Sequence, residues 1–191
     1  EVGARAIAKL FVDSGYTRPA ILKGDDNHRS SKERLAGVMD VLGKAGITVD
    51  PRVIANGRFS RTEGYAAIMQ MARAGLLAPG GDAAYDGAGI DSVIALNDVM
   101  GIGAMTALRA NGIEPGREVG ITGFGDIPYS ADVHPSLTTV HLPLAEMGQA
   151  AVDCVLADRD DAGAADSAAG KPLIFVQSAP DIVLRESLPR R

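Results

Sequence analysis

Three side chains that could hold a small molecule each follow a short apolar run of the chain. Arg34, Phe59 and Asn97 come after three successive runs of this kind, and each run predicts a buried strand. A guanidinium offers a rigid fork of donors for paired hydroxyls or a carboxylate, an aromatic ring offers an apolar face, and an amide both donates and accepts. Because the carboxyl ends of parallel strands meet at one edge of a sheet, we expect these side chains to line one crevice.

Each of these residues also has a purely structural interpretation. Arg34 can form an ion pair with Glu33 or Asp40 on the helix surface, and Phe59 can fill the core of a chain that has only four Phe residues. Asn97 can cap the helix that begins beside it, although we expect the neighbouring Asp98 to be the cap. From the residues alone, both interpretations stay open.

Strand-like and helical patterns of apolar residues alternate along most of the chain. Helices are predicted at residues 2–12, 32–44, 61–74, 98–110 and 144–156, and strands at residues 19–23, 51–55, 92–96, 118–122, 173–176 and 182–185. Ser30 or Ser31 is expected to cap the second helix, and Ser60 with Glu63 forms a predicted capping box for the third. This alternation predicts an α/β fold with a doubly wound parallel sheet.

The composition argues against several classes of protein. The 191 residues include 19 Lys and Arg and 24 Asp and Glu, and the net charge of −5 does not suit a surface that neutralises DNA phosphates. The single cysteine, Cys154, excludes an internal disulfide and favours a reducing compartment, the cytoplasm. No apolar segment approaches the length that spans a bilayer and no signal-peptide pattern occurs, so no membrane partner is expected.

No pattern of residues indicates catalysis. Two Gly-x-Gly pairs lack the third glycine and the distant acid of a dinucleotide site, and no phosphate-binding loop or nucleophile elbow occurs. His28, His134 and His141 lack metal-ligand spacing. We therefore expect no catalytic residue, no metal and no cofactor. A doubly wound enzyme stays an alternative, because a fold alone does not define a function.

Several short segments occur together in a recognisable order. They are ERLAG at residues 33–37, GRFS at 57–60, NDVMGIGA at 97–104, GFGD at 123–126, PSLTTV at 135–140 and VLRES at 183–187. In these segments, and over nearly its whole length, the chain resembles the effector-binding region of the LacI/GalR-type transcriptional repressors of bacteria. A string of motifs in one order is far more specific than any one of them.

The resemblance implies a periplasmic-binding-protein-like (type I) architecture with two lobes. Residues 1–141 would form the C-terminal lobe, residues 142–172 a helix of the N-terminal lobe with a flexible connection, and residues 173–191 the strands that return to the C-terminal lobe. The DNA-binding headpiece of the family and the first part of its N-terminal lobe have no counterpart in the chain. The apolar face of the helix at 144–156 is therefore expected to pack on a partner chain or to be poorly ordered.

The resemblance also implies a small-molecule effector, a sugar or sugar derivative. The positions that match the family's pocket, some of them loosely, are Arg34, Phe59, Asn97, His28, Ser30, Leu144 and Asp126. From the sequence alone, His28 and Ser30 are better explained as solvated loop residues, and Leu144 equally well as core. Gly125 stands where the family usually has an acidic residue that accepts hydrogen bonds from the ligand, and the backbone register directs the neighbouring Asp126 elsewhere. The effector is therefore not identified.

The resemblance further implies a homodimer, and operator DNA bound only through the headpiece. The expected two-fold interface runs from Val99 to Arg109 and from Ile127 to His134, with Gly101, Gly103 and Ala104 allowing a close approach of helices. The same small residues can instead pack on the sheet of their own chain. A periplasmic-type solute-binding protein of the same architecture is the alternative function.

Overall fold

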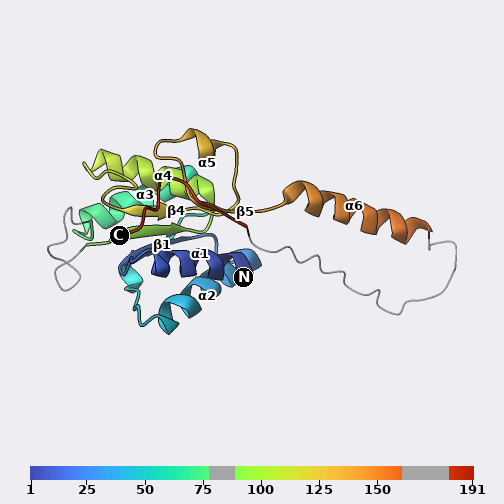
Figure 1. Ribbon diagram of the computed structural model, residues 1–191, viewed down its shortest axis with the longest axis horizontal. Coiled ribbons are helices and arrows are strands. Elements are labelled where there is room, and N and C mark those ends of the chain that lie inside the picture. The colour runs from blue at the N-terminus through green and yellow to red at the C-terminus, as the bar shows by residue number, and fades with distance from the viewer. Residues whose placement is uncertain (78–88, 161–180) are drawn as a thin grey trace. The chain divides into compact units, whose positions relative to one another are not determined.

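The computed structural model describes residues 1–77, 89–160 and 181–191 (Figure 1). The chain divides into two compact units. Unit 1 consists of Glu1–His141 with Pro180–Arg191, and unit 2 consists of Leu142–Ala179. The strand predicted at residues 173–176 and most of the predicted flexible connection lie outside the described residues.

A four-stranded parallel sheet forms the centre of unit 1, which confirms the predicted α/β fold with a doubly wound sheet. The strands are β1 (Pro19–Lys23), β2 (Ile54–Asn56), β3 (Ser92–Ala95) and β4 (Gly120–Thr122), in the spatial order β2-β1-β3-β4. Ile21 of β1 pairs with Ile54 on one side and with Ile94 on the other. The connections reverse direction between β1 and β3, and open α/β sheets bind their ligands outside the carboxyl ends of the strands at such a point.

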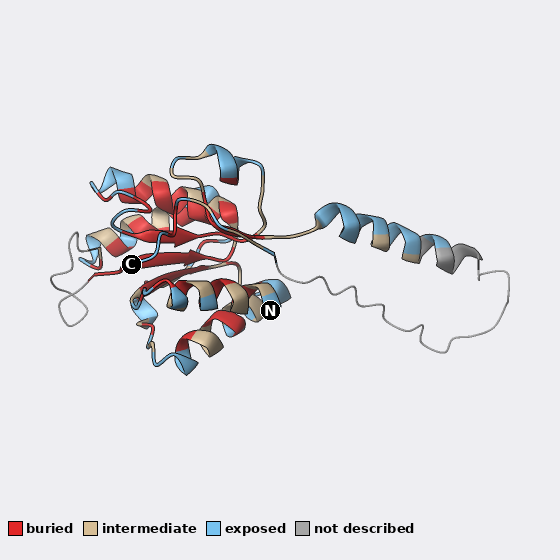
Figure 2. Ribbon diagram, viewed as in Figure 1, coloured by how far each residue is buried: buried red, intermediate tan, exposed pale blue. Residues whose placement is uncertain are grey.

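Two pairs of helices cover the two faces of this sheet. Helices α1 (Val2–Asp13) and α2 (Arg29–Lys44) lie on one face, and α3 (Arg61–Arg73) and α4 (Asp98–Ala110) lie on the other (Figure 1). Strands β1, β3 and β4 and the inner sides of the helices are largely buried, whereas the edge strand β2 is partly exposed (Figure 2). The largest core side chains are mostly aliphatic and include Ile7, Phe11, Ile21, Leu22, Ile94, Leu96, Met100 and Leu108. Each buried side chain of this size stabilises the fold by roughly 1.5–3 kcal/mol.

Helices α3 and α4 approach so closely that a larger residue than glycine has no room at two contact positions. A Cβ atom on Gly103 would lie 2.1 Å from the carbonyl oxygen of Arg61, and one on Gly64 would lie 2.5 Å from the carbonyl oxygen of Met100. Gly101 is buried on the same helix. The prediction that Gly101 and Gly103 serve a two-fold interface is therefore wrong, because both glycines face the interior of their own chain.

A separate pair of strands marks the places where the chain leaves unit 1 and returns to it. Strands β5 (Thr139–His141) and β6 (Asp181–Val183) pair antiparallel, and β5 runs beside the end of β4 through two parallel bridges. The chain leaves unit 1 after His141 and returns at Pro180. Strand β5 and the short helix α5 (Tyr129–Asp132) were not predicted, because three or four residues are too few to show a periodic pattern.

Several element boundaries differ from the predicted ones. Helix α2 begins at Arg29 rather than at residue 32 and has His28 at its N-cap, so neither Ser30 nor Ser31 caps it. Ser60 does precede α3, but its side chain makes no capping hydrogen bond. Helix ends are decided by local contacts as well as by propensity, and they are the least predictable part of an element.

Unit 2 contains the helix α6 (Leu144–Asp160), which includes the predicted helix at residues 144–156. Its exposed apolar side chains are Leu144, Met147, Val152 and Leu156. Such a row of apolar residues on one helix is typical of a surface that packs on another element. The expected packing of this face on a partner chain stays a prediction.

Candidate ligand-binding site

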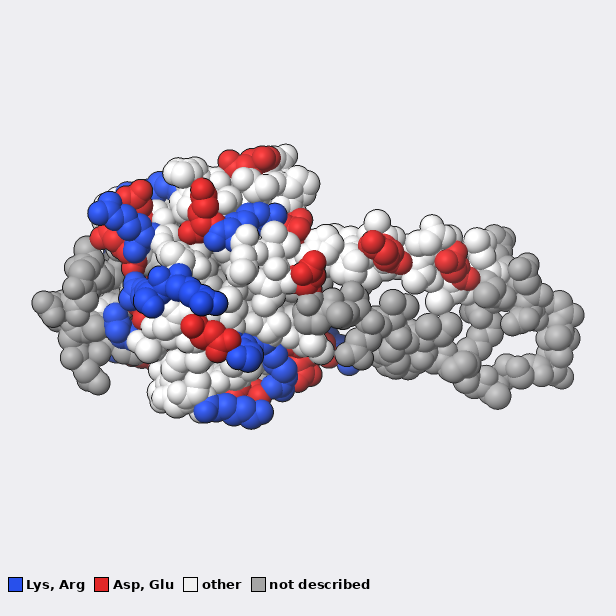
Figure 3. Space-filling model, in the orientation of Figure 1, with Lys and Arg blue, Asp and Glu red and all other residues white. Residues whose placement is uncertain are grey.

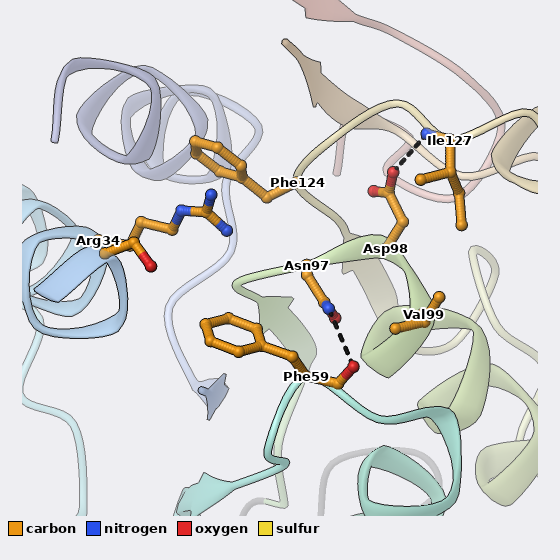
Figure 4. Close-up of a pocket in the computed structure, with 8 residues that line it drawn as sticks. Arg34, Phe59, Asn97, Asp98, Val99, Phe124 and Ile127 are labelled. Carbon is orange, nitrogen blue, oxygen red and sulfur yellow. Dashed lines mark hydrogen bonds between the residues drawn. The ribbon is translucent and has the colours of Figure 1, made fainter. Parts of the chain in front are cut away.

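A cavity of about 300 Å³ opens at the carboxyl ends of the parallel strands of unit 1. It is lined by Ser30, Arg34, Phe59, Asn97, Asp98, Val99, Phe124 and Ile127 (Figure 4). These residues belong to the segments that follow β1, β2, β3 and β4. The structure therefore brings Arg34, Phe59 and Asn97 to one hollow, at the place where doubly wound sheets bind ligands.

Arg34 reaches the cavity from the first half of α2. Its Nη1 donates to the carbonyl oxygen of Leu96 over 2.6 Å, and its guanidinium carbon lies 4.0 Å from the centre of the Phe124 ring. In the described part of the chain, Nε and Nη2 have no hydrogen-bond partner. Burial lowers the pKa of Arg34, while the attraction of Asp98 acts in the opposite direction. The Nε and Nη2 groups of this half-buried guanidinium are thus left to face the cavity.

Phe59 lies in a tight loop between β2 and α3. Arg58 and Phe59 have positive φ angles of 46° and 54°, a backbone conformation that residues other than glycine rarely adopt. The Phe59 ring rests directly on Gly24, the first residue after β1, where a Cβ atom would lie 2.0 Å from the ring. His28 contacts the same ring, edge to face, with the two centroids 5.9 Å apart. The lack of a side chain at Gly24 therefore makes room for the Phe59 ring, which forms one wall of the cavity.

Asn97 takes the capping role that the sequence predicts for Asp98, and Asp98 is buried against other parts of the chain. Asn97 caps α4, because its Oδ1 accepts from the backbone N–H of Met100 over 2.9 Å. Its Nδ2 donates to the carbonyl oxygen of Phe59 over 3.4 Å. Asp98 is only 1% exposed, and its carboxylate accepts from the Thr139 hydroxyl and from the Ile127 N–H. The prediction of Asp98 as the cap is wrong, since both residues suit an N-cap and contacts distant in sequence decide between them.

Asp126 is not among the described residues that line the cavity, although it was predicted as a ligand contact. Its carboxylate accepts from Arg185 Nη2 over 2.7 Å and contacts His141 Nδ1 over 2.9 Å. Burial alone would raise the pKa of Asp126, but the hydrogen bonds and charges of Arg185 and His141 outweigh it and lower this pKa. Asp126 therefore ties the end of β4 to residues at β5 and just after β6.

The remaining predicted positions lie in different places. Ser30 lines the cavity and is exposed, whereas His28 contacts it only through Phe59. Leu144 belongs to α6 of unit 2 and is 60% exposed there. The sequence reasoning missed Phe124, although its position directly after an apolar run was a usable signal.

Two further kinds of site are absent from the described residues. No group of three or more His, Cys, Asp or Glu side chains there could hold a metal ion. In the same residues, no helix combines the length and the apolar character needed to span a bilayer.

The comparisons with known proteins agree with this geometry. The family described as "periplasmic binding protein-like domain" matches residues 8–187. The HTH-type transcriptional regulator AscG of Escherichia coli is 33% identical over 144 residues, which cover 75% of this chain and 39% of AscG. Helix-turn-helix regulators of this kind are therefore relatives of the chain.

Solved structures give the same result. A sugar-binding transcriptional regulator of the LacI family from Escherichia coli, complexed with phosphate, is 29% identical with a TM-score of 0.78, covering 100% of this chain and 61% of its own. The complex of the transcriptional regulator CelR with cellobiose is 26% identical with a TM-score of 0.79, covering 97% of this chain and 51% of its own. The chain thus spans between two fifths and three fifths of the length of these proteins. It belongs to the periplasmic binding protein-like domain family, and within that family to the LacI/GalR type.

Proposed function

We propose that this chain is the effector-binding region of a LacI-type, DNA-binding transcriptional regulator. The observation that carries the proposal is the cavity in which Arg34, Phe59 and Asn97 meet at the carboxyl edge of the sheet. The relatives support it, because they are transcriptional regulators, one of them solved with cellobiose and another with phosphate. A regulator of this type acts in the cytoplasm, where bacterial DNA lies.

The ligand is a small molecule of the carbohydrate class. The free donors of Arg34 and the hydroxyl of Ser30 bind its polar groups, and the rings of Phe59 and Phe124 contact its apolar faces. Asn97 acts mainly on the shape of the site, because both of its polar groups already contact the protein. His28 supports the site indirectly, through its contact with the Phe59 ring, and Asp126 does so through its ion pair with Arg185.

The chain does not itself contact DNA in this proposal. Basic and acidic side chains are interspersed over the face shown in Figure 3, and the net charge is −5. Such a surface does not neutralise a row of phosphates. Operator DNA is bound by a separate headpiece, and the ligand shifts DNA binding only by its difference in affinity for two arrangements of the protein.

The protein forms a two-fold dimer through the exposed side of α4 and the segment from Ile127 to His134. The inner side of α4 packs within the chain, so the stripe available for a partner includes the half-buried Ile102 and Thr106 and the exposed Arg109. Tyr129, on α5, is 68% exposed and adds an aromatic anchor of the kind that interfaces favour.

A thermal-shift screen with sugars, sugar phosphates and nucleosides tests the proposed function. A ligand at about one hundred times its Kd stabilises the folded protein by about 2.7 kcal/mol if it binds only that state. Arg34→Ala and Phe59→Ala should abolish the shift while the unliganded variants still unfold cooperatively. Arg117→Ala, at an exposed site before β4, should shift as the wild type does. The proposal fails if both cavity variants keep the full shift.

A further inference from the structure

The charged groups that line the cavity differ in how far a ligand can reach them. The two in the described lining are Arg34 and Asp98. Asp98 is 1% exposed, and its oxygens accept from the Ile127 N–H over 2.9 Å and from the Thr139 hydroxyl. Arg34 is half-buried, and in the described residues its Nε and Nη2 lack partners. A ligand therefore meets the cation and not the carboxylate.

The nearby residues that could supply a hydrogen-bond acceptor to a ligand either have no side chain or already accept a hydrogen bond from the protein. Gly125 has no side chain, and its φ of +133° disfavours any other residue. Asp126 points to Arg185 and His141. The Oδ1 atom of Asn97 already accepts from a backbone N–H. Within the described lining, the accessible polar groups are thus mainly donors.

Such a set of groups favours one class of ligand. A half-buried guanidinium stacked on Phe124 has lost part of its hydration, and burial lowers its pKa. A neutral hydroxyl replaces that hydration only weakly, whereas a carboxylate or phosphate accepts two hydrogen bonds from the fork and balances its charge. Charge-assisted hydrogen bonds are roughly twice as strong as neutral ones.

We propose that the ligand of this cavity carries an anionic group, a carboxylate or a phosphate ester, that accepts hydrogen bonds from Arg34. This inference rests on the proposed function and narrows its ligand from carbohydrates in general to acidic sugar derivatives. The apolar part of such a ligand lies between Phe59 and Phe124.

The experiment compares matched neutral and acidic compounds on the natural protein in which the chain occurs, at constant ionic strength. Calorimetric titration is carried out with glucose, glucuronate and glucose 6-phosphate, with ribose and ribose 5-phosphate, and with inorganic phosphate. We expect at least one acidic member to bind about tenfold or more tightly than its neutral counterpart. We also expect inorganic phosphate to compete with it.

Two substitutions of Arg34 and one control separate charge from fold. Arg34→Gln should reduce the preference for the acidic compound to less than about threefold, and Arg34→Lys should keep part of it, because a lysine retains the charge without the fork. Arg117→Gln removes the same charge from an exposed site before β4 and should leave the preference unchanged. Thermal unfolding of each variant verifies that it is folded.

The outcomes distinguish this inference from the proposed function. Neutral sugars that bind as tightly as their acidic counterparts would overturn the anionic ligand and leave the effector-binding proposal standing. A preference for acids that survives in Arg34→Gln would also overturn it. If no compound binds, and none shifts the unfolding temperature, both proposals are overturned.

Discussion

Asp126 and Arg185 form an ion pair in which Oδ1 and Nη2 are 2.7 Å apart and each side chain is 17% exposed. Arg185 also donates through Nη1 to the carbonyl oxygen of Leu137 over 2.8 Å. The pair thus joins the loop after β4 to the segment before β5 and the segment after β6. The chain passes to unit 2 after β5 and returns to unit 1 just before β6. This ion pair therefore holds in place the two segments of unit 1 at which the chain leaves and re-enters it.

Removing the charge of Asp126 should therefore destabilise the protein. Asp126→Asn leaves the guanidinium of Arg185 partly buried without its counter-charge, and we expect the free energy of unfolding to fall by about 2 kcal/mol. Urea unfolding at pH 7 measures the change. The matched control is Glu114→Gln, which breaks an exposed pair with Arg117 and should cost less than about 0.5 kcal/mol. Equal losses in the two variants would contradict the buried-pair argument.

The same pair predicts how the difference between wild type and Asp126→Asn varies with pH. The folded protein lowers the pKa of Asp126, so this carboxylate stabilises the fold above its unfolded pKa of about 3.9. That contribution is lost as the pH falls through the lower, folded pKa. The stability gap between the two proteins should therefore close as the pH falls below about 4. Urea unfolding of both proteins from about pH 7 to about pH 2 tests it, and a gap that does not close below about pH 4 would refute the assignment.

The sheet and the location of the cavity could be predicted because long periodic segments define them. The run at 19–23 reads as a buried strand, and α4 is bounded by polar residues at both ends, as observed. Arg34, Phe59 and Asn97 follow such elements, so their meeting at one edge follows from parallel topology alone.

The roles of the acidic residues could not be predicted, because their partners are distant in the sequence. Asp98 accepts from Thr139, 41 positions away, and Asp126 from Arg185, 59 positions away. Local propensity treats Asn97 and Asp98 as nearly equal caps. The choice between them depends on the buried hydroxyl of Thr139, which only the tertiary fold brings to the start of α4.

The capping role of Asn97 and the buried contacts of Asp98 make a prediction about stability. Asn97→Ala should cost about 1 kcal/mol, the usual value of an N-cap, and Asn97→Asp should restore most of it because aspartate caps equally well. Asp98→Ala should cost more, about 3 kcal/mol, since it leaves the Thr139 hydroxyl and the Ile127 N–H without their acceptor. Chemical unfolding of the three variants gives the order. A larger loss for Asn97→Ala than for Asp98→Ala would restore the original assignment.

The proposed dimer predicts that one exposed aromatic residue matters for association. Tyr129→Glu places a charge in the proposed interface and should weaken dimerisation about tenfold or more, as measured by sedimentation velocity over a concentration series. Leu184→Glu is the control, because Leu184 is 66% exposed and lies outside both proposed segments. A dimer unaffected by the charge at Tyr129 would place the interface elsewhere.

The contact between Gly24 and Phe59 predicts a change that affects the ligand more than the fold. In Gly24→Ala the new methyl group would lie 2.0 Å from the Phe59 ring, so the ring must turn away from its place in the cavity wall. A side chain moves more easily than a backbone, and we expect a loss of about 1 kcal/mol in stability. Ligand affinity should fall about tenfold, because the aromatic contact is lost. Gly43→Ala, on α2, is the control: its Cβ would meet nothing within 4 Å, so affinity should be unchanged while the helix is slightly stabilised. If Gly24→Ala binds the ligand as tightly as Gly43→Ala does, Phe59 is not a wall of the binding site.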